Sequence, residues 1–194
     1  FGERRVSFGY RADGTIETVT DGRNFVTTAN DWKRGLPQEV VYPLATGVRR
    51  ATVDDNGWVT SITDETANVR SYLYDPLGRI TSITYPAGWA PTVREFAPIQ
   101  NAEYGLPAGS WKQTIATGNY RKHIWFDALW RPILEREWDA TDAVGTQRFV
   151  RRGYDLRFNE NFVSFAASSI NTINDLSAGT TTQFDRLNRR TAVS

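Results

Sequence analysis

Apolar and polar residues alternate along many short segments of this chain. The alternation is clearest at residues 58–62 ("WVTSI") and 79–85 ("RITSITY"), and a spacing of two is typical of strands that bury one face. Gly, Pro, Asn or Asp interrupts the pattern about every ten residues, whereas the apolar spacing typical of a helix is scarce. The sequence therefore predicts an all-β protein built from many short antiparallel strands.

One turn between two such strands is especially well defined. In "YDPLGRI" at residues 74–80, Asp75 and Pro76 suit the first two positions of a type I turn, and Gly78 suits the positive φ of the bulge that follows. Aromatic and β-branched residues alternate with polar residues on both sides of the turn. Residues 69–85 are therefore predicted to form a β-hairpin.

The same turn pattern recurs along the chain. Its copies, complete or degenerate, begin at Tyr10, Val53, Phe126, Tyr154 and Phe184, and a further turn lies at residues 30–37. Such repetition is the sequence signature of a tandem array of one supersecondary unit. We predict a single array over residues 1–194, with about eight hairpin units and a looser connection at residues 88–107.

Two stretches depart from the repeat. Residues 88–107 contain prolines at positions 91, 98 and 107, which restrict strand pairing, so we expect a longer connection there. Residues 159–183 carry little charge and many Ser, Thr and Asn residues, a composition that also suits a disordered linker. We expect strands there instead because β-forming residues recur, namely Phe162, Val163, Phe165, Ile170 and Ile173.

Composition narrows the function classes. The 194 residues include 23 Lys and Arg against 22 Asp and Glu, which argues against a nucleic-acid-binding protein because phosphate binding needs concentrated positive charge. The absence of cysteine excludes disulfides, thiolate catalysis and thiolate metal sites. No apolar run approaches the ~18 residues of a membrane helix. The chain has no methionine and opens on a strand pattern, so we expect a piece of a longer protein.

The residues that could carry chemistry do not form a catalytic or metal-binding motif. His123 is the only histidine and has no nucleophile motif nearby, so we interpret it as a structural or surface residue. Residues 139–145 ("DATDAVG") lack the ligand spacing of a calcium loop and are predicted to be a turn. Turn chemistry alone explains Asp75 next to Pro76. We expect no enzyme activity, no catalytic residue, no metal and no cofactor.

Seven tryptophans are the unusual feature of the composition. Exposed, they would serve as stacking platforms for sugars or as anchors for a protein partner. Trp58, Trp89 and Trp111 are the possible binding aromatics. Packing within the sheet is the simpler interpretation for the set as a whole, because aromatic residues are common in strands.

Residues 72–80 resemble the signature of YD repeats, also called Rhs repeats, which reads roughly Tyr-x-Tyr-Asp-x-x-Gly-Arg followed by Leu or Ile. The residues that carry this signature, and that we expect to be structural, are Tyr10, Gly14, Asp54, Gly57, Tyr72, Tyr74, Asp75, Gly78, Arg79, Phe126, Asp127, Tyr154, Asp155, Phe184 and Asp185. Trp130, Phe158 and Asn188 depart from it, since each stands where the turn glycine belongs. These departures concern the type of turn and leave the hairpins in place.

The resemblance implies tandem antiparallel β-hairpins that form a curved strip, part of the wall of a hollow YD-repeat shell. Such shells enclose a C-terminal toxin domain in bacterial Rhs proteins and in the C component of insecticidal Tc toxins, and a related barrel serves adhesion in teneurins. The implied partners are the rest of the shell, the enclosed toxin domain and secretion-apparatus or adaptor proteins, with no nucleic acid and no membrane segment in this piece. The implied location is secreted or at the cell surface. The autoproteolytic site of the bacterial relatives has no counterpart here, so no catalytic role is implied.

Two functions are therefore open. The first is a structural, non-catalytic shell segment that encapsulates and helps to deliver a toxin domain absent from this chain. The alternative is an extracellular carbohydrate- or protein-binding module that uses exposed Trp and Tyr residues. The direction in which the aromatic side chains point distinguishes the two.

Overall fold

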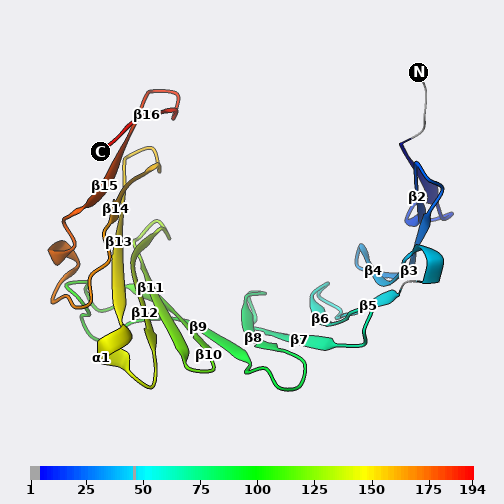
Figure 1. The fold of residues 1–194 in the computed structure, drawn as a ribbon, viewed down its shortest axis with the longest axis horizontal. Helices are drawn as coiled ribbons and strands as arrows, with labels where there is room; N and C mark the ends of the chain where they lie inside the picture. Colours follow the sequence, from blue (N-terminus) through cyan, green and yellow to red (C-terminus); the bar gives the residue numbers. More distant parts are fainter. Residues whose placement is uncertain (1–4, 46) are drawn as a thin grey trace. The chain divides into compact units, whose positions relative to one another are not determined.

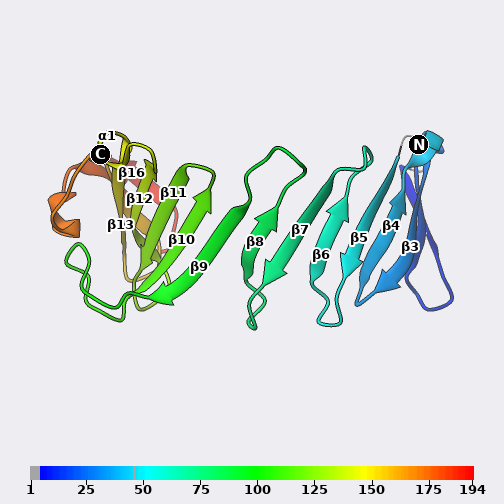
Figure 2. The same ribbon diagram turned by 90° about the horizontal axis from the view of Figure 1, so that it is seen from below.

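The structure of the chain is a computed structural model that describes residues 5–45 and 47–194. The chain divides into two compact units, Phe1–Pro91 and Thr92–Ser194, which run from blue to green and from green to red in Figure 1. Within each unit the strands lie side by side in chain order (Figure 2), and each is antiparallel to the next. The all-β fold of tandem hairpins predicted from the sequence is confirmed. No helix in the described part of the chain is long and apolar enough to span a membrane.

Unit 1 is a meander of short strands. Its described residues form β1 (Val6–Tyr10), β2 (Ile16–Asp21), β3 (Val26–Lys33), β4 (Leu36–Val41), β5 (Val48–Val53), β6 (Val59–Thr63), β7 (Val69–Tyr74) and β8 (Ile80–Thr84), with a 3₁₀ turn at Pro43–Ala45. The hairpin predicted at residues 69–85 is β7 and β8, in which Tyr72 lies opposite Ile83. The turn predicted at residues 30–37 joins β3 to β4.

Unit 1 buries little apolar surface. Among its described residues, Val53 is the one apolar side chain that is fully buried, at 2% exposed. The other strand residues are half-buried or exposed, because a sheet without a second layer leaves both faces open to water. Cross-strand pairs and turns therefore supply much of what holds this unit together.

Unit 2 continues the meander and adds longer connections. Its strands are β9 (Thr92–Pro98), β10 (Trp111–Thr117), β11 (Tyr120–Phe126), β12 (Pro132–Asp139), β13 (Arg148–Tyr154), β14 (Glu160–Ser164), β15 (Gly179–Phe184) and β16 (Arg190–Val193), with helix α1 (Ala143–Thr146) and a 3₁₀ turn at Ile173–Asp175. The turn predicted at residues 139–145 connects β12 to β13 and runs into α1. Asp142 caps this short helix by accepting the N–H of Gly145 at 2.9 Å.

The connection expected at residues 88–107 is shorter than the sequence pattern indicates. Strand β9 lies inside this stretch, since Pro98 is the last residue of the strand and does not interrupt it. The boundary between the two units, after Pro91, also falls within the stretch. The expectation of a longer connection at residues 88–107 was therefore wrong for residues 92–98, which form a strand.

The strands expected at residues 159–183 form only at the two ends of that stretch, as β14 and the first part of β15. Phe165, Ile170 and Ile173 lie in the connection between these strands, so the expectation of strand was wrong there. Ile170 and Ile173 pack against the hydrophobic core of unit 2. Burial, and not strand pairing, accounts for Ile170 and Ile173, whereas Phe165 is 66% exposed.

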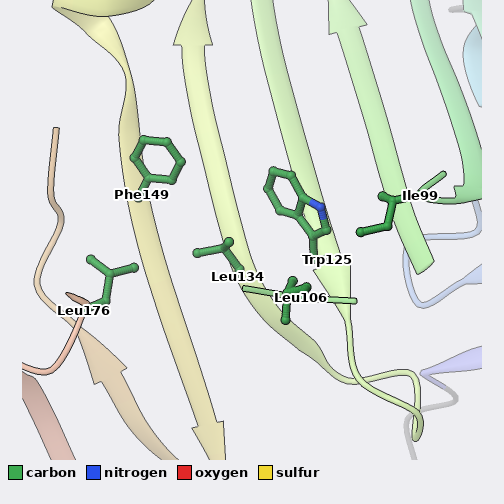
Figure 3. Packing of buried hydrophobic residues seen from close by; sticks show 6 residues of the cluster. All are labelled: Ile99, Leu106, Trp125, Leu134, Phe149 and Leu176. Atoms are coloured by element: carbon green, nitrogen blue, oxygen red, sulfur yellow. The ribbon is translucent and has the colours of Figure 1, made fainter. Parts of the chain in front are cut away.

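One face of the unit 2 sheet, which we call the core face, carries that hydrophobic core. Trp125, Leu134 and Phe149 project from the adjacent strands β11, β12 and β13, and each is at most 2% exposed. Two connections, residues 99–110 and 165–178, cover this face and are called the covering loops. Figure 3 shows the six buried side chains of the cluster, Ile99, Leu106, Trp125, Leu134, Phe149 and Leu176. The covering loops thus provide the second layer that unit 1 lacks.

Candidate functional site: the signature turns

The turn between β7 and β8 is held by the side chain of Asp75. Its Oδ1 accepts the backbone N–H groups of Leu77 (2.9 Å) and Arg79 (3.0 Å), and its backbone carbonyl accepts the N–H of Gly78 (2.9 Å). Arg79 closes the turn with a 2.6 Å bond from Nε to Oδ2 of Asp75. Gly78 has a φ of 78°, in the left-handed region. One carboxylate therefore satisfies the N–H groups of the turn and fixes its shape.

The same bonds recur in other signature turns. In each, an aspartate Oδ1 accepts the N–H groups of the residues two and four positions later at 2.8–3.0 Å, and these aspartates are Asp54, Asp127, Asp155 and Asp185. In each of these hairpins the register shifts by one residue next to the turn, with the extra residue on the strand that follows it, opposite the signature residues Val53, Tyr74, Phe126, Tyr154 and Phe184. The copies recognised in the sequence are thus one structural motif.

The first copy keeps the backbone of this turn without the carboxylate. Arg11 follows Tyr10 where the other copies have aspartate, and Gly14 has a φ of 84°. The backbone bond from Gly14 N–H to the Arg11 carbonyl is 3.0 Å. The Arg11 guanidinium instead reaches β3, where it donates to the carbonyl of Ala29 (2.6 Å) and to Oδ1 of Asn30 (2.8 Å).

Three later copies keep the turn type although they lack its glycine. Trp130, Phe158 and Asn188 have φ values of 64°, 70° and 60°, close to that of Gly78. Asparagine visits this region readily, but a bulky aromatic residue there is strained by about 1–3 kcal/mol. The aspartate bonds of Asp127 and Asp155 compensate this strain, so the turn type does not change along the array.

Two further turns with the same bonds escaped the sequence analysis. Asp21 and Asp64 each accept N–H groups from the residues two and four positions later, and Asn24 and Ala67 hold the left-handed position. No aromatic residue precedes either aspartate, so these turns lack the Tyr-Asp pair that marks the repeat. The sequence feature that could have located these two turns is an aspartate followed by about four turn residues and then a new strand.

Two of the turn aspartates, Asp75 and Asp185, are held as charged acceptors. The backbone N–H of Arg79 and, beyond it, the Arg79 side chain hold the pKa of Asp75 below its ordinary value. In Asp185 the backbone and side chain of Arg189 lower the carboxyl pKa in the same way. A carboxylate that stays ionised and is fully engaged in hydrogen bonds is suited to structure and not to proton transfer.

Tyrosine hydroxyls of the signature tie one hairpin to the preceding one. Tyr74 donates to the carbonyl of Val59 (2.7 Å), and Tyr154 donates to the carbonyl of Pro132 (2.9 Å). Val59 and Pro132 hold equivalent positions, five residues after the aspartate of the preceding turn. The signature tyrosine is therefore a connector between repeats.

The residue four positions after a turn aspartate makes a second connection, to the following hairpin. The ring of Trp58 lies 5.2 Å from that of Tyr74. In the later copy Arg131 takes this place, with its guanidinium 4.7 Å from the centre of the Tyr154 ring and a 3.4 Å bond to the carbonyl of Asp155. The signature side chains thus bind turns and neighbouring hairpins.

Replacing Gly78 with alanine tests this packing. The new Cβ would lie 3.1 Å from the Trp58 ring and would also be strained by the φ of 78°. In Gly14→Ala the φ is 84° but no atom lies within 4 Å of the new Cβ. We expect a loss of unfolding free energy of about 2 kcal/mol for Gly78→Ala and about 1 kcal/mol for Gly14→Ala, measured by urea unfolding. Equal losses would show that Trp58 does not restrain the turn.

The three tryptophans named as possible binding aromatics do not form one site. Trp58 is half-buried against Tyr74 and Gly78. Trp89 is 76% exposed in the segment after β8. Trp111, in unit 2, lies parallel to Phe96 with ring centres 5.0 Å apart. Their possible role in binding stays a prediction.

Trp111 belongs to an aromatic cluster that the sequence analysis did not recognise. Trp130 lies 5.3 Å from Trp111 and 5.2 Å from Phe96, and Phe126 lies 5.5 Å from Phe96, between ring centres. Trp130 comes from a turn and is 54% exposed. The pairing of the strands brings these residues of β9, β10, β11 and the β11–β12 turn together, and the sequence alone does not give that pairing.

His123 lies on the core face between two tryptophans. Its ring centre is 5.5 Å from that of Trp125 and 4.7 Å from that of Trp138. Burial, and next the charge of Lys112, lower the pKa of His123 to about 4, so the imidazole is neutral at pH 7. No group of three or more His, Asp or Glu residues able to hold a metal exists in the part of the chain that the structure describes.

Comparison with known proteins agrees with the repeat geometry. The family model described as RHS Repeat matches residues 53–88, which include the turns of Asp54 and Asp75. A crystal structure of TcdB2-TccC3 without hypervariable C-terminal region superposes with a TM-score of 0.66 at 10% identity, over 97% of this chain and 15% of that chain. A crystal structure of TcdB2-TccC3-TEV gives a TM-score of 0.63 at 11% identity, with the same coverage. No curated protein matches the chain.

These likenesses establish the fold, and the chain spans 15% of the length of the chains that it matches. The fold is that of the Tc toxin shell, a strip of antiparallel hairpins. The RHS repeat at residues 53–88 and the recurrence of its signature turn as far as Asp185 make the chain similar to Rhs/YD-repeat proteins.

Proposed function

We propose that this chain is a segment of the wall of a longer Rhs/YD-repeat shell, which encapsulates and helps to deliver a toxin domain that lies outside the chain. The observation that carries the proposal is the use made of the signature side chains. Asp75 and Asp127 close turns, and Tyr74 and Tyr154 bind the preceding hairpin. Side chains engaged in this way build a continuous wall and not a reaction centre. The likeness to the TcdB2-TccC3 structures supports the same function.

The proposal treats residues 1–194 as one array of about eight hairpins from a larger secreted protein. Its partners are the rest of the wall, the enclosed toxin domain, and secretion-apparatus or adaptor proteins. The chain itself contributes structure and no catalytic step. Neighbour contacts supply the stability of such an array, so the wall needs the hairpins on both sides of each repeat.

The test uses the longer protein as its source makes it. Native protein is treated with protease, and the fragments are identified by intact mass after separation by size-exclusion chromatography with light scattering. We expect a C-terminal domain that resists digestion while the shell is intact and is digested once the shell is unfolded. A freestanding protein near 22.0 kDa, or a C-terminal domain that is digested as fast in the native protein as alone, would overturn the proposal.

A second candidate function, a carbohydrate- or protein-binding module, is favoured by the aromatic cluster of Phe96, Trp111 and Trp130. Trp130 is 54% exposed and tolerates a strained φ of 64°, which a residue selected for the turn alone would avoid. Binding of the 194-residue chain to a panel of immobilised glycans, compared between wild type and Trp130→Ala, separates the two functions. Selective glycan binding that is abolished in Trp130→Ala would support the binding module. If no glycan binds, a protein is the only ligand left for such a module.

A further inference from the structure

An open pocket of about 460 Å³ lies on the core face of unit 2, beside the covering loops. Its floor is formed by strand residues Lys112, His123 and Arg136, and one covering loop contributes Glu103 and Tyr104. These strand residues lie close together in the register, since His123 lies opposite Arg136 and two residue pairs away from Lys112. The pocket shares none of its lining with the signature turns.

Arg136 is the unusual residue of this pocket. Its Nη1 donates to the hydroxyl of Tyr104 (3.2 Å) and its Nη2 to Oε1 of Gln147 (2.9 Å), both neutral acceptors. Its Nε is buried and has no hydrogen-bond partner. The guanidinium also packs against aromatic rings, 4.4 Å from the centre of the Trp138 ring. Among the described residues no carboxylate lies within ion-pair distance of this cation.

The other charges of the pocket do not compensate Arg136. Lys112 binds both carboxylate oxygens of Glu103 at 2.7 and 3.0 Å, and Glu103 also accepts the indole N–H of Trp125 at 2.8 Å. His123 is neutral at pH 7 because burial and the charge of Lys112 lower its pKa to about 4. Two cations thus face one carboxylate. A half-buried cation of this kind is stabilised by an anion in reach of its donors.

We propose that this pocket binds a singly charged carboxylate through Arg136. A guanidinium presents parallel N–H donors that match a carboxylate, and one negative charge balances the pocket. A doubly charged phosphate would exceed that balance and be repelled by Glu103. The carboxylate can belong to a small free acid or to a glutamate or aspartate side chain of a polypeptide. This inference concerns unit 2 alone and does not depend on the shell function.

The test uses the 194-residue chain at pH 7 and constant ionic strength. Because His123 is the only histidine, its ring proton signals in NMR report directly on the pocket. The probes are sodium propionate, the blocked peptide acetyl-Gly-Gly-Glu-Gly-Gly-amide, the same peptide with glutamine in place of glutamate, and inorganic phosphate. We expect saturable shifts with the two carboxylates and weaker effects of the glutamine peptide and of phosphate. If the glutamate peptide binds more tightly than propionate, the natural carboxylate belongs to a polypeptide. If propionate binds more tightly, it belongs to a small free acid.

Matched variants assign the effect to Arg136. Arg136→Met keeps much of the packing on Trp138 and is expected to weaken carboxylate binding by about tenfold or more, since it removes a charge-assisted hydrogen bond. Arg148→Met is the control, because Arg148 is exposed and precedes Phe149, so it points away from the core face. Its binding should equal that of the wild type.

Glu103→Gln is expected to change carboxylate affinity in the opposite direction. This variant therefore tests the proposal even if Arg136→Met does not fold. Removal of this carboxylate leaves the pocket with two unbalanced positive charges, so carboxylate binding should tighten by several-fold. Unchanged binding in Arg136→Met or Glu103→Gln would overturn the proposal. Equal shifts from the glutamate and glutamine peptides, or tighter binding of phosphate, would do the same.

Discussion

Replacement of Trp125 by alanine is expected to lower the unfolding free energy of unit 2 by about 3–5 kcal/mol. The Trp125 side chain is 1% exposed and lies at the centre of the core face, opposite Leu134 on the adjacent strand. Its ring contacts Tyr104 edge-on, with ring centres 5.4 Å apart, and its N–H binds Glu103. The substitution therefore leaves a cavity and also removes two contacts that hold a covering loop in place.

The measurement is urea unfolding followed by far-ultraviolet circular dichroism, together with limited proteolysis of the native state. In Trp125→Ala we expect early cleavage within residues 99–110, because this covering loop loses two of its contacts with the sheet. Trp89→Ala is the matched control, since Trp89 is 76% exposed and its loss should change stability by less than about 0.5 kcal/mol. Similar losses in both variants would show that the core face does not stabilise unit 2.

The hairpins could be predicted from the sequence because their chemistry is local. The turn at Asp75 needs an aspartate, a proline, a left-handed glycine and alternating flanks, and all of them lie within residues 69–85. The same local pattern located the turns of Asp54, Asp127, Asp155 and Asp185. A repeat whose determinants are close in sequence is visible in each of its copies.

The core of unit 2 could not be predicted, because its members are distant in sequence and have no shared period. Ile99 and Leu106 come from one covering loop and Leu176 from the other, and they meet Trp125 and Leu134 only through the pairing of several strands. The prolines near residues 99–110 indicated irregular backbone there, but the β-forming residues of the second covering loop wrongly indicated strand. Their role as a second layer depends on tertiary contacts that local patterns do not contain.

The left-handed aromatic residues show the limit of the turn rules themselves. Glycine is expected at the position of Trp130 and Phe158 because it has no steric cost there. In both turns the aspartate bonds preserve the backbone shape without glycine. The side chain of Trp130 then joins the cluster with Phe96 and Trp111. Knowledge of the neighbouring strands is needed to see why an aromatic residue is acceptable there.

Replacement of Asp127 by alanine should have the largest effect among the turn aspartates, a loss of about 2 kcal/mol of unfolding free energy. Asp127 accepts the N–H groups of Leu129 (2.9 Å) and Arg131 (3.0 Å) and binds Nε of Arg131 at 2.7 Å. Without that carboxylate Arg131 loses its anchor, and its contacts with Tyr154 and with the carbonyl of Asp155 loosen. The damage therefore extends from one hairpin to the next.

Asp185→Ala is the control for this prediction, because it removes an identical set of turn bonds in the last hairpin. The side chain of its partner Arg189 is 73% exposed, whereas that of Arg131 is 23% exposed. Water therefore replaces much of the lost ion pair in Asp185→Ala, and we expect a loss of unfolding free energy of less than about 1 kcal/mol. The loss of unfolding free energy in Asp127→Asn should lie between those of Asp127→Ala and Asp185→Ala, since asparagine keeps an oxygen that accepts the turn N–H groups but carries no charge. Urea unfolding gives the three values, and hydrogen exchange at residues 154–160 shows whether the next hairpin loosens. If Asp127→Ala costs no more than Asp185→Ala and leaves that exchange unchanged, the turn aspartates act only within their own hairpins, and the connection between repeats rests on the tyrosines alone.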